Sequence, residues 1–222
     1  MKRYTGAIFD MDGVLFDTER VFQQTWREIA AERGIELDEG ITEAVSGTNG
    51  AVMCRVIEQF YHVPDGTEIM NTCKRRVREK VSRAVPVKAG AREIIAFFRS
   101  EGLRIAVASS SSREQILSNL TLSGLLPSVD AIVSGEEVAV GKPDPGIFLR
   151  AAQAIRCAPE DCFVFEDSRS GVKAGHAAGC DTVMVPDLIP PNAETLPLCF
   201  RIFDSLSDAL EALRPVVSAG KD

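Results

Sequence analysis

Short apolar runs alternate along most of the chain with stretches whose apolar residues recur every three or four positions. Runs rich in Ala, Ile, Val and Phe predict buried strands, and the intervening pattern predicts helices. We place strands at residues 4–10, 103–109, 131–134, 162–165, 181–185 and 200–203. This alternation predicts an α/β fold, in which helices cover both faces of a doubly wound parallel sheet.

One segment breaks the alternation, because residues 18–86 contain no convincing strand pattern. They contain three amphipathic helical stretches instead, and Trp26 lies on the apolar stripe of the first, which indicates packing rather than ligand contact. The stretches cover about residues 18–33, 52–60 and 69–81. We therefore expect a smaller helical cap domain, residues 18–86, inserted after the first strand of a core formed by residues 1–17 and 87–222.

Two helix starts carry specific signals. Ser168 is expected to cap a helix that ends before Gly179. Asp144 followed by Pro145 predicts an N-cap and the first residue of another helix.

Charge and apolar content limit the possible partners. The 222 residues carry a formal net charge of −7, with a pI near 5.0, which disfavours binding to a nucleic-acid backbone. No uncharged apolar stretch approaches the roughly 20 residues needed to cross a bilayer, and the amino terminus has no signal-peptide pattern. We expect a cytoplasmic protein without nucleic-acid or membrane partners.

The six cysteines form no Cys-x-x-Cys pair and stand among apolar neighbours. They are expected to be reduced thiols, because zinc sites and disulfide frameworks have characteristic spacings.

Two carboxylates, Asp10 and Asp12, follow the first apolar run. Residues i and i+2 of extended chain point the same way, so both side chains can face one small volume at the strand's carboxyl end, from which Gly13 lets the chain turn away. Asp-Gly is also common turn chemistry, and an acidic turn is the alternative. Because two such carboxylates repel each other without a cation or a shared proton, the pattern indicates a Mg²⁺ site.

A stretch of four serines follows the second apolar run. Ser109 and Ser110 stand where hydroxyl and free backbone N–H groups at a helix start can bind a phosphate. Ser111 and Ser112 are explained equally well as helix caps, since Ser111 and Glu114 have the spacing of a capping box.

Two later segments carry further charged candidates. Lys142 stands in a Gly-Lys-Pro-Asp-Pro loop stiffened by its prolines, although a lone Lys is usually a solvated surface charge. Glu166 and Asp167 directly follow an apolar run. Adjacent carboxylates at a strand end are costly without a cation, and Mg²⁺ prefers oxygen ligands, so both are candidate metal ligands.

These segments together resemble the four motifs of the haloacid dehalogenase superfamily in its phosphotransferase form. Residues 10–18 are similar to the first motif, DxDGxxxDT, and Ser109 stands at the position of the second. The loop around Lys142 resembles the third motif, and Glu-Asp-Ser at 166–168 the fourth. The resemblance covers essentially the whole chain and implies a Rossmann-like core with a helical cap.

The resemblance also implies a role for each matched residue. Asp10 is expected to attack phosphorus, and Asp12 to act as general acid and then as general base. Ser109 and Lys142 would bind phosphoryl oxygens, and Lys142 would also steady the charge of the nucleophile. The implied ligands of Mg²⁺ are Asp10, the backbone carbonyl of Asp12, Asp167 and, directly or through water, Glu166.

The expected function is Mg²⁺-dependent hydrolysis of a small phosphorylated metabolite, a sugar phosphate or a nucleoside monophosphate, through an aspartyl-phosphate. Asp12 favours a phosphate ester, because the dehalogenases proper lack an Asp at the matching position. An intramolecular phosphotransferase resembling beta-phosphoglucomutase is the alternative, and a non-catalytic binding protein on the same fold is a remote one. We expect a monomer.

Two cap positions favour the phosphatase over the mutase. Beta-phosphoglucomutases carry a His on the first cap helix and an Arg in the following loop, where this chain aligns Phe22 and Asn49. Neither side chain can supply the charge or the donor that holds the free phosphate of a bisphosphorylated intermediate. Arg20, Arg55 and Lys74 are the cap residues that could substitute.

Overall fold

The computed structural model describes residues 2–45, 48 and 50–219 and places six strands in one parallel sheet, ordered β3-β2-β1-β4-β5-β6. The strands are β1 (Gly6–Phe9), β2 (Arg104–Ser109), β3 (Ala131–Ser134), β4 (Cys162–Glu166), β5 (Asp181–Met184) and β6 (Arg201–Ile202). The α-helices of the described residues are α1 (Thr18–Glu32), α2 (Ile41–Val45), α3 (Gly50–Tyr61), α4 (Thr67–Val81), α5 (Ala91–Ser100), α6 (Arg113–Ser123), α7 (Gly146–Ala154), α8 (Arg169–Ala177) and α9 (Leu206–Ser218). All six predicted strands are present, and the predicted fold class is confirmed.

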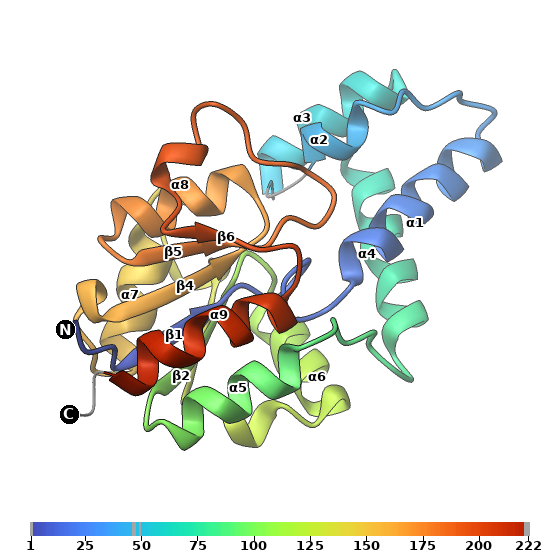
Figure 1. Cartoon of the computed structure of the whole chain (residues 1–222). Coiled ribbons are helices and arrows are strands. Elements are labelled where there is room, and N and C mark those ends of the chain that lie inside the picture. The colour runs from blue at the N-terminus through green and yellow to red at the C-terminus, as the bar shows by residue number, and fades with distance from the viewer. Residues whose placement is uncertain (1, 46–47, 49, 220–222) are drawn as a thin grey trace.

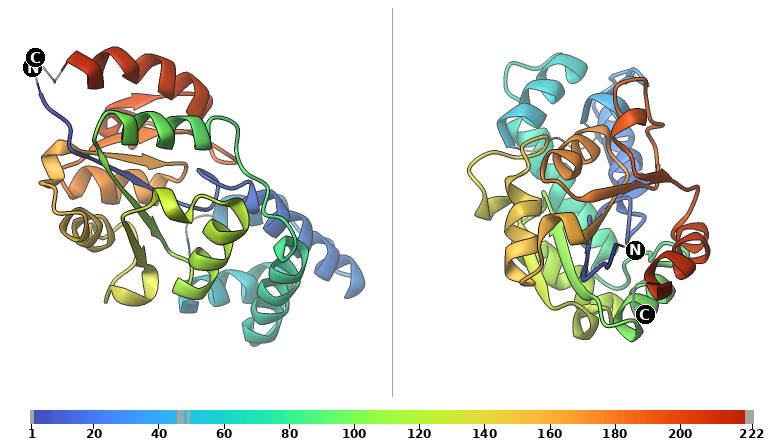
Figure 2. Two further views of the ribbon diagram at one scale, coloured as in Figure 1. Left: turned by 90° about the horizontal axis from the view of Figure 1, so that it is seen from below. Right: turned by 60° about the vertical axis from the view of Figure 1, so that its left-hand side comes forward.

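The sheet separates two hydrophobic cores. Ala7 and Phe9 of β1 pack toward α5, α6 and α9, whereas Ile8, between them, packs toward α7 and α8. Figures 1 and 2 show these two helical layers on opposite faces of the sheet. Since both faces are covered, the strands are apolar at successive positions rather than at every second one.

Helices α1–α4 form a separate body beside the carboxyl ends of the strands (Figures 1 and 2). They surround their own hydrophobic cluster, in which Trp26 is 1% exposed and its ring packs edge-on against Tyr61. Trp26 is therefore a packing residue, as predicted. The sequence missed α2, because five residues are too few to establish a helical period.

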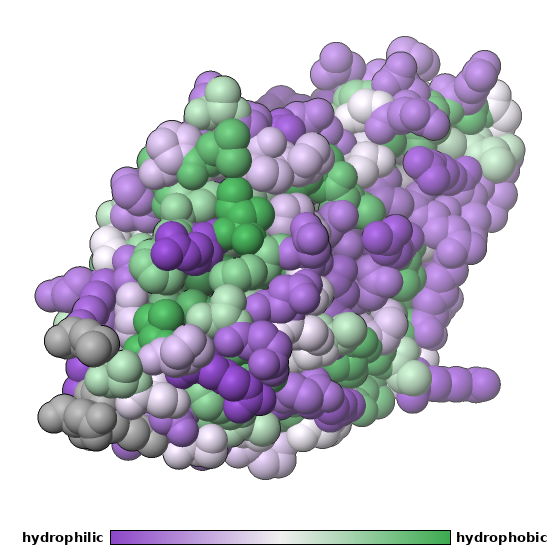
Figure 3. All heavy atoms as spheres, viewed as in Figure 1, coloured by the Kyte–Doolittle hydropathy of each residue, from purple (hydrophilic) through white to green (hydrophobic). Residues whose placement is uncertain are grey.

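Ion pairs between α1 and α4 hold the cap together on its outer side. Arg76 donates to both carboxylate oxygens of Glu32 at 2.7 Å, and Lys80 donates to Glu28 at 2.7 Å. The view in Figure 3 shows a mostly hydrophilic surface over these helices. The apolar stripes of α1 and α4 consequently face inward.

The two connections between core and cap run side by side. Phe16 and Val87 form an antiparallel bridge, Asp17 N donates to Pro86 O at 2.9 Å, and Lys88 N donates to Leu15 O at 2.9 Å. This pairing supports the division of the chain at 17/18 and 86/87, which we retain as a proposal.

Two of the expected helix starts differ from the structure. Helix α7 begins at Gly146 with Pro145 as its N-cap, one residue later than predicted, and Asp144 Oδ1 accepts the Gly146 N–H at 2.8 Å. Of the two serines left open as caps, Ser112 caps α6 and accepts the Gln115 N–H at 3.3 Å, so the helix begins one residue later than the Ser111 capping box would place it. The Ser168 cap of α8 is confirmed.

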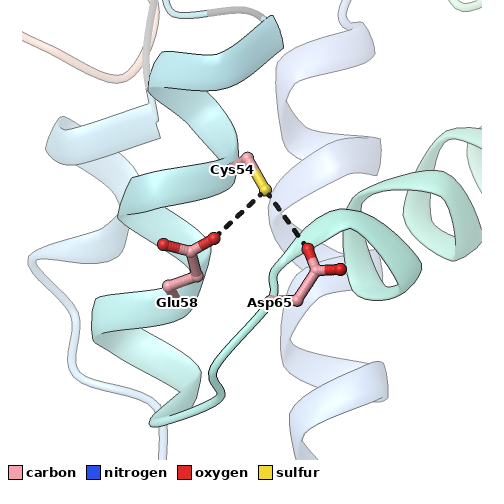
Figure 4. A group of neighbouring side chains, drawn as sticks. All are labelled: Cys54, Glu58 and Asp65. Atoms are coloured by element: carbon pink, nitrogen blue, oxygen red, sulfur yellow. Dashed lines mark hydrogen bonds between the residues drawn. The ribbon is translucent and has the colours of Figure 1, made fainter.

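The six cysteines are free thiols, as predicted. Cys54 lies within 3.5 Å of a Glu58 oxygen and 3.8 Å of an Asp65 oxygen, as Figure 4 shows. Glu58 also accepts the Gly66 N–H, and Asp65 the Thr67 N–H, so these carboxylates fix the turn between α3 and α4. This cluster is explained by that structural role. No helix among the described residues has the length and apolarity needed to cross a membrane.

Candidate active site

A cavity of about 670 Å³ lies between the carboxyl ends of the strands and the cap. This volume is typical of small-molecule sites. All seven residues assigned to the site from the sequence line it: Asp10, Asp12, Ser109, Ser110, Lys142, Glu166 and Asp167.

Asp10 and Asp167 face this cavity from neighbouring strands. Asp10 directly follows β1 and donates its N–H to Phe165 O at 2.9 Å, while Asp167 directly follows β4. Gly13 has φ +82°, and a Cβ added there would lie 2.2 Å from Asp167 Oδ2. A side chain at position 13 would therefore displace the Asp167 carboxylate.

Lys142 joins two of the carboxylates. Its Nζ donates to Asp10 Oδ1 and to Glu166 Oε1, both at 2.5 Å, and its side chain is 3% exposed. Burial alone would lower the pKa of Lys142, but the carboxylates of Asp10 and Glu166 raise it above its ordinary value. Lys142 is therefore a fixed positive charge beside Asp10, not the solvated surface lysine of the alternative interpretation.

Glu166 is anchored at both oxygens. Its Oε1 accepts from Lys142, and its Oε2 accepts from the N–H groups of Asp167 and Ser168 and from Ser168 Oγ, each at 2.9 Å. A Cβ on Gly171 would lie 1.8 Å from Glu166 Oε1, so a glycine at this position makes room for the carboxylate. The geometry gives Glu166 a direct part in positioning Lys142.

Asp12 is held by hydroxyl groups from two directions. Thr18, the first residue of cap helix α1, donates to Oδ1 at 2.5 Å, and Ser111 donates to Oδ2 at 2.8 Å. Ser109 lies 3.4 Å from the same Oδ2 and accepts the Ser111 N–H at 3.1 Å. Asp12 and Asp10 thus face one cavity but have different partners.

Thr18 was not assigned to the site from the sequence, and Ser111 was left open between a helix cap and a role in the site. Thr18 ends the DxDGxxxDT segment, so its motif position was the available signal. Which of Ser111 and Ser112 caps α6 depends on the residue at which the helix begins, and the sequence does not determine that start to within one residue. Ser110 lines the cavity, and no side-chain hydrogen bond of Ser110 is found among the described residues.

The floor of the cavity carries an excess of negative charge. Burial raises the pKa of Asp10 to about 7, with Glu166 and Asp12 adding to the rise and Lys142 opposing it. Burial, together with Asp12 and Asp10, raises the pKa of Glu19 to about 8.

A cation fits this floor. Asp167 is 7% exposed, and its carboxylate has no hydrogen-bond or ion-pair partner within the described part of the chain. Burial and the neighbouring Glu166 and Asp10 raise its pKa well above the ordinary value. An unpartnered buried carboxylate beside a second carboxylate is the donor set that Mg²⁺ prefers.

The structure places some of the cap residues on which the choice between phosphatase and mutase depends. Phe22 lines the cavity, whereas Asn49 lies outside the described residues. Lys74 also lines the cavity, so one of the three possible basic substitutes is in place. Arg20 instead lies 3.2 Å from Asp17, and Arg55 is not among the lining residues.

Comparison with known proteins agrees with this geometry. The family model described as haloacid dehalogenase-like hydrolase matches residues 7–185. A phosphorylated carbohydrates phosphatase of Thermotoga maritima is 32% identical over 181 residues, covering 80% of this chain and 82% of that protein. The fructose-1-phosphate phosphatase YqaB of Escherichia coli is 30% identical over 186 residues, covering 83% and 97%.

A solved structure described as a putative beta-phosphoglucomutase from Thermotoga maritima has a TM-score of 0.75 and 28% identity, covering 96% of this chain and 99% of that one. The four strand-end motifs, the family model and these relatives agree: the chain belongs to the haloacid dehalogenase-like hydrolases.

Proposed function

We propose that this protein is a Mg²⁺-dependent phosphatase that hydrolyses a small phosphorylated metabolite through an aspartyl-phosphate. One observation carries the proposal. Asp10 is held by Lys142 at 2.5 Å, while Asp12, held by Thr18 and Ser111, faces the same cavity from two residues away. A nucleophile and a separate proton carrier are what transfer of a phosphoryl group in two steps requires.

In the first step, a carboxylate oxygen of Asp10 attacks phosphorus and the bond to the leaving oxygen breaks. The described residues give Asp10 Oδ2 no hydrogen bond, so this oxygen is available for attack. Asp12 gives its proton to the leaving alcohol. Lys142 stabilises charge on the phosphoryl oxygens, which is the main need of phosphoryl transfer.

In the second step, water attacks the phosphorus of the aspartyl-phosphate. Asp12, now ionised, takes a proton from that water, and the Asp10 carboxylate leaves as phosphate is released. The cap covers the cavity from the side opposite the strands and limits the access of water during the first step.

The residues that would hold Mg²⁺ are Asp10, Asp167 and the backbone carbonyl of Asp12, with Glu166 positioned to contribute through water. When bound, Mg²⁺ neutralises the phosphoryl oxygens and the crowded carboxylates.

The test measures phosphate release from a panel of sugar phosphates and nucleoside monophosphates. We expect activity with Mg²⁺, none with EDTA, and none in an Asp10→Asn variant that retains the wild-type melting temperature, because an amide is a poor nucleophile. Full activity in EDTA, or activity of more than a few per cent in Asp10→Asn, would disprove the proposal. The monomeric state and the cytoplasmic location stay predictions.

An intramolecular phosphotransferase is the second candidate, because Lys74 brings a basic side chain to the cap wall. A coupled assay for conversion of glucose 1-phosphate to glucose 6-phosphate, primed with a bisphosphorylated sugar, separates the two. We expect phosphate release to exceed isomerisation.

A further inference from the structure

A short chain of hydrogen bonds leads from the first motif to the side of the cavity formed by α6. Met11 lies between Asp10 and Asp12 and is fully buried, and Asn119 of α6 is 1% exposed. Asn119 Nδ2 donates to Met11 Sδ at 3.8 Å, and Gln115 Nε2 donates to Asn119 Oδ1 at 2.8 Å. Gln115 and Asn119 both line the cavity, and the proposed mechanism uses neither.

The chemistry of these groups determines which way the Gln115 amide points. The Met11 sulfur has no hydrogen to donate, so the buried Asn119 amide turns its NH₂ group to the sulfur and its oxygen to Gln115. The reverse orientation would leave the Asn119 oxygen against the sulfur without a donor, which buried polar atoms avoid. Gln115 therefore offers its own NH₂ group to Asn119, and its oxygen Oε1 points away from Asn119.

Gln115 Oε1 is an acceptor without a protein donor. It makes no hydrogen bond with the residues that the structure describes, and its side chain is half-buried at the cavity surface. Arg78, which reaches α6 from the cap, donates to the neighbouring Glu114 at 3.4 Å. Val77 and Val81 of the cap line the same cavity and cannot donate. This oxygen is therefore open to a donor on a bound ligand.

Gln115 lies near the place where the alcohol part of the substrate begins. In the proposed mechanism Asp12 gives its proton to the leaving oxygen, so the alcohol starts beside Asp12. Ser111 donates to Asp12 at 2.8 Å and leads directly into α6, and Gln115 lies in the first turn of that helix. A hydroxyl group on one of the next carbons of the alcohol can donate to Oε1, whereas a CH₂ group would leave this oxygen without a partner.

We propose that Gln115 is a specificity-determining residue, whose Oε1 accepts a hydrogen bond from a hydroxyl group on the alcohol part of the substrate. The preferred substrates are then phosphate esters of polyols and sugars, rather than esters of alcohols without a further hydroxyl group. This inference rests on the proposed phosphatase function and adds a substrate class to it.

The test uses phosphate esters that differ by single hydroxyl groups. Glycerol 1-phosphate is compared with 2-hydroxypropyl, 3-hydroxypropyl and propyl phosphate, so the set shows which hydroxyl group is bound. Phosphate release gives kcat and KM of the wild type, and calorimetry with Mg²⁺ gives the affinity of the Asp10→Asn protein, which needs no turnover. We expect both kcat/KM and affinity to fall by about tenfold from glycerol 1-phosphate to propyl phosphate, because one hydrogen bond is lost.

Variants assign the preference to Gln115. Gln115→Met keeps the length of the side chain but removes the acceptor, so it should raise KM for glycerol 1-phosphate by about tenfold, with kcat and the constants for propyl phosphate unchanged. Gln24→Met is the matched control, because Gln24 Nε2 likewise donates one helical turn along, to Glu28 Oε1 at 3.0 Å, but Gln24 is exposed on α1 and does not line the cavity. This control should keep the preference.

An ether tests the direction of the hydrogen bond. The ether oxygen of 2-methoxyethyl phosphate accepts but cannot donate, so Gln115 should not favour this compound over butyl phosphate, which has a chain of the same length. A preference for the ether that disappears in Gln115→Met would show a donor at this position and would contradict the assignment of Oε1.

Equal kcat/KM and equal affinity for the hydroxylated and plain esters, or a preference that survives Gln115→Met, would overturn the inference. Failure of the proposed function is a separate result, namely the absence of phosphate release by the wild-type enzyme from every compound. The calorimetric comparison still measures the preference in that case.

Discussion

Substitution of Gly171 by Ala tests how the site is supported. Position 171 lies in the first turn of α8, where Ala favours the helix over Gly by about 1 kcal/mol. The added Cβ would lie 1.8 Å from Glu166 Oε1 and 1.9 Å from its Cδ. The carboxylate must therefore move, although it ends a flexible side chain, and moving it breaks its contacts with Lys142 and with the donors of residues 167 and 168.

The magnitude follows from those contacts. Breaking a buried ion pair costs about 3–5 kcal/mol, and subtracting the helix gain leaves about 2–4 kcal/mol of lost stability. For a chain of this length we expect the melting temperature to fall by about 5–15 °C. Because Lys142 then loses the group that positions it beside Asp10, kcat should fall by about 100-fold or more.

The assay pairs thermal unfolding with phosphate release, and two variants serve as controls. In Gly175→Ala the new Cβ would lie 2.6 Å from Thr182 Oγ1, away from the site, so this variant can lose stability but should keep its kcat. In Glu166→Asp the shorter side chain already withdraws from Gly171, so adding Gly171→Ala should cost little more. A Gly171→Ala enzyme with wild-type kcat, or effects that simply add in the double variant, would refute the reasoning.

Three further predictions concern single side chains. Asp12→Asn should lower kcat strongly on a sugar phosphate and less on nitrophenyl phosphate, whose leaving group needs little protonation, and equal losses would count against the general-acid role. Ser111→Ala should lower kcat/KM by about tenfold at an unchanged melting temperature, whereas Ser112→Ala, which removes the cap of α6, should cost about 1 kcal/mol of stability and leave the rate unchanged. Asp167→Asn should raise the melting temperature of the metal-free protein at pH 8, because a crowded carboxylate charge is removed, and should abolish the stabilisation by Mg²⁺ seen in a thermal-shift titration.

Features that depend on a local pattern of residues can be predicted from the sequence. The strands are contiguous apolar runs, so their positions were predictable. Asp10, Lys142 and Asp167 each stand within a motif that fixes their place in the fold, so these site residues were predictable too. Ser111 was not, because a shift of one residue in the start of α6 decides whether its hydroxyl caps the helix or reaches Asp12. The sequence offered Lys74 only as one of three possible cap cations, because which of them faces the cavity depends on how the cap helices pack.

The bridge between Phe16 and Val87 has a consequence for how such a chain can change. Because both ends of the cap leave the core at this bridge, residues 18–86 form a closed loop on the core. The entropy of closing a loop grows only slowly with its length, and doubling that length costs about 0.6 kcal/mol. Helices can therefore be added to the cap, removed from it or replaced with little effect on the free energy of folding of the sheet. The cap part of the cavity lining can therefore change while the residues of the cavity floor, which lie outside the loop, stay the same.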